Sequence, residues 1–401
     1  MDNLTHSLIG IVAAEAITKT QTKKKLHFPL TVVSIFANNF PDLDFIYTPL
    51  MGGRAASLGH HRGHTHTLLL SPIMAVLSVF ALFLFLRLRG KTEKFSKKEK
   101  LVLFLTALLG IFLHIFADSW NSYGVHPFWP FQNRWLYGDF IFIIEPFLWM
   151  AMLPFAYWSL ESRLAKNVIL TFFALTSGII LFSGFVPISI SIFCFLFGAT
   201  FFVVYSKIKP CERLVMTTVS ILFVLTFFYS SSLKTKKIIK DAVKKSFPLT
   251  KLHDVILSPY PGNPFCWRFG TVESIDDLYV VRTGIASPYV KLFPAGHCPE
   301  ISFFQGKDQV PMVPVPAFQD PKILWEKQFE GSISDLKKLK TNYCGVNAFL
   351  RFSRMPGWAY DDKNELYFLD LRFRGPFVVT DLKNCDIVIP PWQSPRADLG
   401  I

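Results

Sequence analysis

The feature that most constrains this chain is a series of long apolar runs in its N-terminal half. A helix needs about 20 residues to cross the hydrocarbon core of a bilayer. Two weaker segments, 7–18 and 28–47, are short or carry polar residues, so each could be a span or a buried half-span. Together these segments predict a polytopic α-helical membrane domain. The six strongest runs are residues 67–88, 101–118, 140–158, 167–183, 187–205 and 213–232.

Composition agrees with a membrane protein and divides the chain in two. Hydrophobic residues make up 51% of the chain and charged residues only 18%, which is unusual for a soluble protein. Acidic residues are sparser in residues 1–232 than in residues 233–401. We therefore expect a helical transmembrane domain at 1–232 and an extramembrane domain at 233–401.

The second half has the pattern of a small β-rich (α+β) domain. Apolar residues alternate with polar ones at 278–284, 346–354 and 365–373, between turns rich in proline and glycine. This period of two predicts strands of an antiparallel sheet. Residues 332–341 instead predict a short amphipathic helix that begins at a serine cap.

Basic clusters between the apolar runs predict the orientation in the membrane. If every run crosses once, four clusters fall on one side, which the positive-inside rule assigns to the cytoplasm of a plasma or inner membrane. The histidine-rich loops and the C-terminal domain then lie on the outer face. The cluster 234–245 does not fit, so it is either a basic helix on anionic headgroups or a sign of one miscounted span. The four clusters are 19–25, 87–100, 162–166 and 207–213.

The net charge of +13 follows from these cytoplasmic loops. Because the positive-inside rule already explains the charge, we expect the lipid bilayer as a partner and no nucleic acid.

Histidine and aspartate residues gather at the outer ends of the apolar segments. His114 and Asp118 are spaced i, i+4, so both lie on one face of a helix. Imidazole and carboxylate together suit zinc, with manganese or iron as alternatives, and as many as six ligands allow one or two ions. Ionisable groups among membrane helices usually serve a function. The predicted ligands are His6, Asp42, His61, His66, His114 and Asp118.

Three further residues are candidates for a catalytic role. Asp44 is separated from Asp42 by Leu43. The two side chains would splay apart in an extended chain, so only one of them need bind the metal directly. Arg62 could bind a phosphate or carboxylate with both arms, or form a salt bridge with Asp42 or Asp44. Asp139 could act as a general base.

The loop 119–139 is rich in tryptophan, tyrosine and proline. Its rings could form an interfacial belt or a hydrophobic lip that receives an acyl or prenyl chain. His126 of this loop could approach the metal, and Glu145 further on could support the site or pair with Arg134.

Four motifs in order resemble the membrane-bound metal-dependent hydrolases of the YdjM type. They are "MDNLTHSLIG", "PDLD", "HRGHTHT" and "LHIFADSWNSYGVHPFWPF". The family pattern is an N-terminal TH, a PDxD, an HRGxTHS and an HxxxD followed by T-x-x-G and PF, and the match covers roughly the first 150 residues. Thr67 stands where the family prefers serine, and Asn121 replaces its usual threonine. The resemblance implies a metal site and hydrolysis.

The ligand chemistry points to the same reaction. A divalent ion lowers the pKa of bound water from 15.7 to about 7, which supplies hydroxide for hydrolysis. We therefore expect an integral membrane metal-dependent hydrolase acting on a lipid-like or membrane-delivered ester or phosphoester. The alternatives are a metal ion or proton transporter and a metal-stabilised membrane scaffold without turnover.

Four of the six cysteines lie in the C-terminal domain: Cys266, Cys298, Cys344 and Cys385. If that domain is outside the cytoplasm, up to two disulfides with three possible pairings are allowed. Buried free thiols are the alternative.

Overall fold

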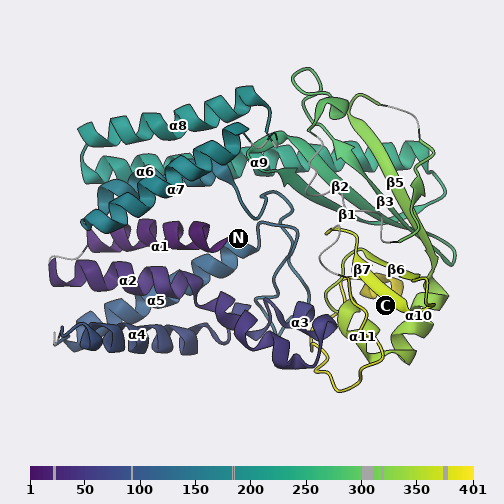
Figure 1. The fold of residues 1–401 in the computed structure, drawn as a ribbon, viewed down its shortest axis with the longest axis horizontal. Coiled ribbons are helices and arrows are strands. Elements are labelled where there is room, and N and C mark those ends of the chain that lie inside the picture. The colour runs from purple at the N-terminus through teal and green to yellow at the C-terminus, as the bar shows by residue number, and fades with distance from the viewer. Residues whose placement is uncertain are drawn as a thin grey trace.

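The computed structural model shows a helical bundle at one end and a β-rich domain at the other (Figure 1). It describes residues 1–20, 24–91, 94–182, 184, 186–299, 310–317, 320–373 and 378–401. This arrangement confirms the predicted fold class, a helical membrane half followed by an antiparallel β domain.

Long apolar helices make up most of the bundle. In the described residues, five are long and apolar enough to cross a membrane: α4 (Ser71–Leu88), α5 (Lys97–Asp118), α7 (Arg163–Phe182), α8 (Ile188–Lys207) and α9 (Pro210–Ser246). They correspond to five of the six predicted runs, although residue 183 of the fourth lies outside the described residues. Their apolar side chains remain exposed on many turns, as expected for surfaces that face lipid.

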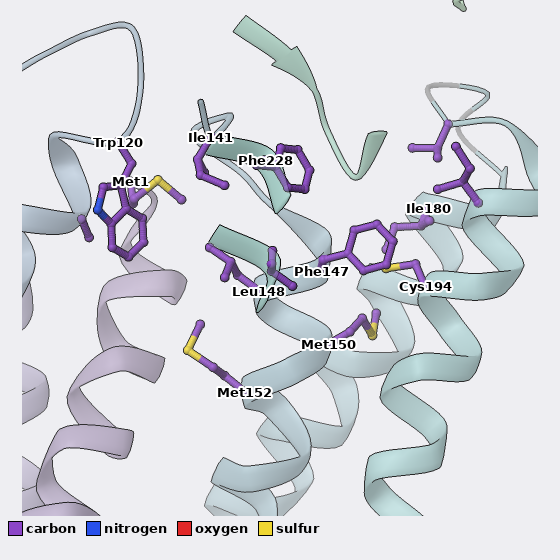
Figure 2. Packing of buried hydrophobic residues seen from close by; sticks show 14 of the residues in the cluster. Met1, Trp120, Ile141, Phe147, Leu148, Met150, Met152, Ile180, Cys194 and Phe228 are labelled. Carbon is purple, nitrogen blue, oxygen red and sulfur yellow. The ribbon is translucent and has the colours of Figure 1, made fainter. Parts of the chain in front are cut away.

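Three shorter helices fill the bundle interior: α1 (Asn3–Thr18), α2 (His27–Asn39) and α6 (Pro146–Ser159). The run predicted at 140–158 is helical only from Pro146, because Glu145 has extended backbone and caps the helix. Figure 2 shows Leu148, Met150 and Met152 of α6 among the buried side chains of the bundle.

Close packing of α1 on α2 places the first two segments side by side. A Cβ on Gly10 would lie 3.0 Å from the backbone Cα of Ile35, so only glycine allows this approach. Ser34 then donates a hydrogen bond of 2.8 Å to the carbonyl of Gly10. The N-terminus is thereby held against the end of the bundle that faces the β domain (Figure 1).

The β domain contains a five-stranded antiparallel sheet in the order β1-β2-β3-β5-β4. The hairpin β6–β7 and two helices cover one end of it (Figure 1). Their bounds are β1 Lys251–Tyr260, β2 Asn263–Ile275, β3 Leu278–Ala286, β4 Val313–Pro314, β5 Ile323–Ser332, α10 Ile333–Asn342, α11 Cys344–Leu350, β6 Pro356–Tyr360 and β7 Leu366–Asp370.

Most predicted elements of this domain are confirmed. Strands β3 and β7 lie at 278–284 and 365–373, and α10 begins after Ser332, whose side chain accepts a hydrogen bond from the backbone of Asp335. The strand predicted at 346–354 was wrong, because α11 occupies most of it. Val346, Phe349 and Leu350 are buried together, and their i, i+3, i+4 spacing matches one helical face.

The predicted boundary at residue 232 falls within α9. This helix has 37 residues and is therefore about 55 Å long, well beyond the roughly 30 Å hydrocarbon core. Its basic C-terminal part, 234–245, continues straight into the β domain (Figure 1). Thr235, Ile239 and Val243 bury one face of that part, while lysines occupy the other.

A short connecting region lies between the bundle and the β domain. It consists of η2 (Pro41–Ile46), η3 (Thr48–Met51), α3 (Arg54–His60) and η4 (His64–His66). In this region α3 packs against α11, so the C-terminal domain covers the loops that carry the histidine motif.

Two disulfides join the four cysteines of the β domain, Cys266 with Cys298 and Cys344 with Cys385. Cys194 and Cys211 of the bundle are free. The structure thus selects one of the three possible pairings.

We expect only Cys194 and Cys211 to react when the purified, denatured protein is alkylated without reductant. Peptide mass spectrometry should find the other four linked in the two pairs. Replacing both Cys344 and Cys385 with alanine should destabilise the protein by about 2–5 kcal/mol, measured as a lower midpoint of thermal unfolding. Alkylation of Cys344 in the wild type would contradict the pairing.

Candidate metal centre

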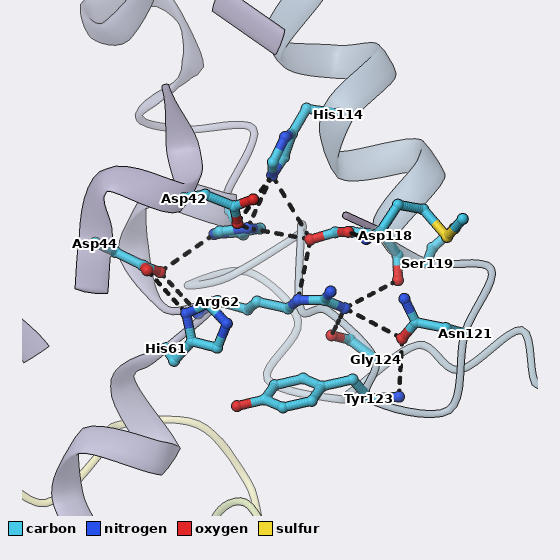
Figure 3. Close-up of polar contacts among 12 residues, drawn as sticks. Asp42, Asp44, His61, Arg62, His114, Asp118, Ser119, Asn121, Tyr123 and Gly124 are labelled. Atoms are coloured by element: carbon cyan, nitrogen blue, oxygen red, sulfur yellow. Dashed lines mark hydrogen bonds and ion pairs between the residues drawn. The ribbon is translucent and has the colours of Figure 1, made fainter. Parts of the chain in front are cut away.

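Three chain segments bring four ionisable side chains together where the bundle meets the connecting region. Asp42 lies in η2, just after α2 ends, and His66 lies in η4. His114 and Asp118 occupy the last turns of α5, one turn apart. Figure 3 shows Asp42, His114 and Asp118 pointing toward a common centre.

The four side chains have the spacing of ligands around one ion. Each offers one ligand atom, and these atoms all lie within 4.8 Å of one another. The Nε2 atoms of His66 and His114 are 3.1 Å apart. Each Nε2 lies 3.4–3.5 Å from Asp42 Oδ1 and 3.3–3.6 Å from Asp118 Oδ2. A tetrahedral ion with bonds of about 2.1 Å has ligands about 3.4 Å apart, so the donor set fits.

Hydrogen bonds on the far side of each ring direct the lone pairs inward. His114 Nδ1 lies 2.6 Å from the carbonyl oxygen of Asn38, which can only accept, so Nδ1 carries the proton. His66 Nδ1 lies 3.1 Å from Thr65 Oγ1, which itself donates to Asp44 at 3.2 Å. With both protons on Nδ1, the two Nε2 lone pairs face each other. Two imidazole lone pairs directed at one point, each fixed by a hydrogen bond at Nδ1, are the arrangement typical of metal sites.

His66 and Asp42 are held in the protonation states that bind metal. Burial lowers the pKa of His66 to about 4, so this ring is neutral at pH 7. Burial alone would raise the pKa of Asp42, but the adjacent imidazoles of His114 and His66 hold that pKa well below its usual value. A neutral imidazole and an ionised carboxylate are the forms that bind metal.

His6 and Arg62 support Asp118 from either side. The ring of His6 stacks on that of His114 at 3.8 Å, and its Nε2 is 3.3 Å from Asp118 Oδ1. The N-terminal ammonium of Met1 contacts the same oxygen. Arg62 Nε lies 3.0 Å from Asp118 Oδ2, and Arg62 Nη1 donates to the side chain of Asn121 at 3.2 Å. Arg62 therefore pairs with Asp118, a partner that sequence analysis did not name.

His61 and Asp44 pair with each other beside the four clustered residues. His61 Nδ1 is 2.8 Å from Asp44 Oδ1, and the His61 ring lies 6.3 Å from that of His66. The other oxygen of Asp44 accepts the backbone N–H of Arg62 at 2.8 Å. Asp44 thus holds the 61–66 loop in place. Of the six predicted ligands, the structure brings four together and places His6 and His61 next to them.

Asp139 is engaged elsewhere, between the bundle and the β domain. Arg354 binds it with both arms, at 2.7 and 3.0 Å, and Lys236 of α9 donates to it at 3.1 Å. Asp254 of β1 binds the same guanidinium. These ion pairs tie the loop after α5 to the C-terminal domain.

The buried Glu145 joins α6 to the β domain. It accepts hydrogen bonds from the backbone of Phe147 and of Gly262 in the β1–β2 turn, at 3.1 and 3.2 Å. In the structure Glu145 pairs with the backbone of Gly262 and not with Arg134. Glu145 therefore helps to position the sheet on the bundle.

The C-terminal domain covers the histidine loops through contacts that the sequence does not indicate. Trp392 stacks on the buried His126 at 4.0 Å and contacts His60 and His64 edge-on at 5.5 and 5.6 Å. Arg372 donates to the carbonyl of Ser122 at 2.6 Å. No local pattern around Trp392 indicates this role, because its partners lie more than 250 residues away in the sequence.

The fold and the cluster define a polytopic membrane protein with a buried His/Asp group able to bind a metal ion. Residues 1–187 match the model of the YdjM inner membrane protein family, so this region of the chain is similar to that family. The match contains all four clustered residues and confirms the resemblance seen in the motifs.

The chain is also similar to the Bacillus subtilis (strain 168) protein described as uncharacterized protein YfhP. The two are 25% identical over 156 residues, which is 38% of this chain and 44% of the relative. The chain thus aligns with less than half of that protein. No solved structure matches.

Replacing His114 with alanine should remove the bound metal, because it deletes one of two imidazole ligands. Asp44→Asn should weaken metal affinity by roughly 10–100-fold, the range for residues that orient ligands. His253→Ala is the matched control, since His253 pairs with Asp398 in the β domain. Metal content is measured by mass spectrometry of purified protein after zinc loading. Full occupancy in His114→Ala would remove this residue from the ligand set.

Proposed function

We propose that the protein is an integral membrane metal-dependent hydrolase with one divalent ion held by Asp42, His66, His114 and Asp118. The observation that carries this proposal is the inward-facing pair of Nε2 atoms 3.1 Å apart, flanked by two carboxylates. Two imidazoles and two carboxylates at tetrahedral spacing favour zinc over manganese or iron. Bound there, the ion would activate water for attack on an ester or phosphoester.

Catalysis needs a coordination position that substrate or water can reach. Asp42 keeps 13% of its side chain exposed, while His66, His114 and Asp118 are completely buried. The open side of the cluster therefore lies at Asp42. Zinc can expand to five ligands, so a water molecule entering past Asp42 would complete the reactive site without displacing a residue.

The residues around the cluster have positioning roles in this proposal. Arg62 and His6 hold the carboxylate of Asp118, and Asp44 orients the loop that carries His66. We assign Asp139 to the ion pair with Arg354 rather than to proton transfer, because cationic donors occupy both of its oxygens.

Exposed apolar side chains around Asp42 support a lipid-like substrate. Phe45, Ile46 and Leu50 are 59%, 64% and 79% exposed, and they follow Asp42 directly in η2 and η3. Exposed apolar groups of this kind are typical of membrane contact. A cluster that opens among them would meet its substrate at the level of the bilayer.

We also propose that the site and the β domain lie on the outer face of the plasma membrane. The described residues of the other four basic clusters lie at the end of the bundle remote from the β domain (Figure 1), which the positive-inside rule assigns to the cytoplasm, and only the cluster 234–245 lies at the β domain. Two disulfides in the β domain agree, because such bonds persist outside the cytoplasm.

A metal-stabilised scaffold is the second candidate function. Four protein ligands complete a tetrahedron, and closed coordination is typical of structural zinc. A transporter is less favoured, because the four residues form one cluster instead of a series along the helices.

Native Cys211 offers a test of orientation, since it is exposed at the start of α9, beside a basic cluster. A membrane-impermeant maleimide should leave Cys211 unlabelled in intact cells and label it after permeabilisation. A cysteine introduced by Lys251→Cys, in the β domain, should label in intact cells. The reverse pattern would place the site in the cytoplasm.

Hydrolysis is tested with the zinc-loaded protein in detergent and in vesicles, on long-chain carboxylic esters and phosphoesters. We expect turnover that a chelator abolishes and zinc restores. Asp118→Asn should reduce it at least about a hundredfold, as for loss of a group that stabilises the transition state. His253→Ala should match the wild type. Full zinc content without turnover on either substrate class would favour the scaffold.

A further inference from the structure

An apolar groove lies between α2 and α4, beside the metal cluster. It has a volume of about 500 Å³ and is lined by side chains that include Val32, Phe36, Ala81 and Phe85. Asn39 contributes a polar side chain to the lining. This volume is in the range of about 300–1,000 Å³ that holds a small molecule.

The direction of the two helices places one end of the groove at the cluster. Helix α2 ends at Asn39, and Asp42 follows three residues later. Helix α4 begins five residues after His66 and runs away from it. Asn39 therefore marks the cluster end of the groove, and Val32 with Phe85 lies deeper in the bundle. At the same helix end, the carbonyl of Asn38 orients His114.

The groove faces the bilayer rather than water. Of the groove lining, Phe85 of α4 is 37% exposed and Val32, Phe36 and Ala81 are half-buried, and α4 is long and apolar enough to cross a membrane. Ordered water in a cavity needs polar partners. The polar side chains in the groove lining are those of Ser78 and Asn39. The side chain of Ser78 already donates to the carbonyl of Met74, and that of Asn39 donates to Ser7 and to the carbonyl of Ile35. Hydrocarbon is the material that fills it.

We propose that this groove holds one acyl chain of a membrane phospholipid, with the headgroup end at Asn39 and Asp42. Acyl chains are the hydrocarbon that a bilayer supplies to any laterally open groove, which is why we choose them over prenyl chains. The seated chain would present its ester or phosphoester to the metal cluster. This last step rests on the proposed hydrolase function, whereas chain binding does not.

The groove would act by positioning and not by strong binding. An acyl chain that enters it leaves one hydrocarbon environment for another, so the hydrophobic effect contributes little. Selection then comes from shape and van der Waals contact with the groove wall. We accordingly expect enrichment of a chain in the groove by several-fold over other lipid-facing surfaces.

The test is photo-crosslinking in nanodiscs with phosphatidylglycerol that carries a diazirine in the middle of one acyl chain. Peptide mass spectrometry should find labels on Phe36 and Phe85 several-fold above those on outward residues of α7 and α8. Ala81→Trp, which fills the groove, should abolish that excess. Val76→Trp, on the exposed face of α4 outside the groove lining, should leave it unchanged.

Even labelling of all lipid-facing helices, or an unchanged excess in Ala81→Trp, would overturn the proposal. So would preferential labelling by a photoactivatable polyprenyl phosphate at the expense of the acyl probe. Zinc content and the thermal midpoint of Ala81→Trp verify that the variant folds. Val32→Trp fills the groove from α2 and repeats the test if Ala81→Trp is unstable.

The same experiment in His114→Ala separates this proposal from the hydrolase proposal. Crosslinking needs no metal, so the groove should be labelled in this variant too. Labelling of the groove without turnover in the wild type would contradict the hydrolase proposal and support acyl-chain binding. Turnover without labelling of the groove would support the hydrolase proposal and contradict acyl-chain binding.

Discussion

The buried carboxylate of Asp118 is the interaction on which this architecture depends. It lies at the end of α5 with no exposure to solvent, and an isolated charge there would be very costly. Groups from two other parts of the chain offset that cost: the N-terminal ammonium of Met1 with His6 of α1, and Arg62 from the loop after α3. His66 of η4 lies 3.3 Å from the same carboxylate. Each segment must reach the same point, so the carboxylate fixes how the ends of the first helices are arranged. A divalent ion at the cluster would neutralise the same charge.

The β domain stabilises this arrangement from outside the bundle. Arg354 binds Asp139 of the loop after α5, and Trp392 stacks on His126 of the same loop. Helix α9 joins both halves as one continuous element. The loops that carry the histidines are consequently enclosed between two packed units, which keeps water away from all of the cluster except the side at Asp42.

Sequence analysis found the membrane half, the antiparallel domain and all four clustered residues, because each leaves a local signal. Length and hydropathy identify spans, and the i, i+4 spacing of His114 and Asp118 places both on one helical face. Local signals failed where long-range contacts decide. Residues 346–350 alternate like a strand, yet they form α11, with the disulfide from Cys344 to Cys385 at its start. Likewise, nothing near Asp139 indicates that Arg354, 215 residues away, occupies both of its oxygens.

The sequence by itself determined which residue types are available and at which helix ends they lie, since both follow from patterns a few residues long. The tertiary structure decided how these residues are used. It separated four residues at ligand spacing from His6 and His61 beside them, and it paired Arg62 with Asp118. These choices depend on differences of a few ångströms between segments that meet only in the folded chain. Sequence spacing carries no information on such distances, because packing between helices sets them.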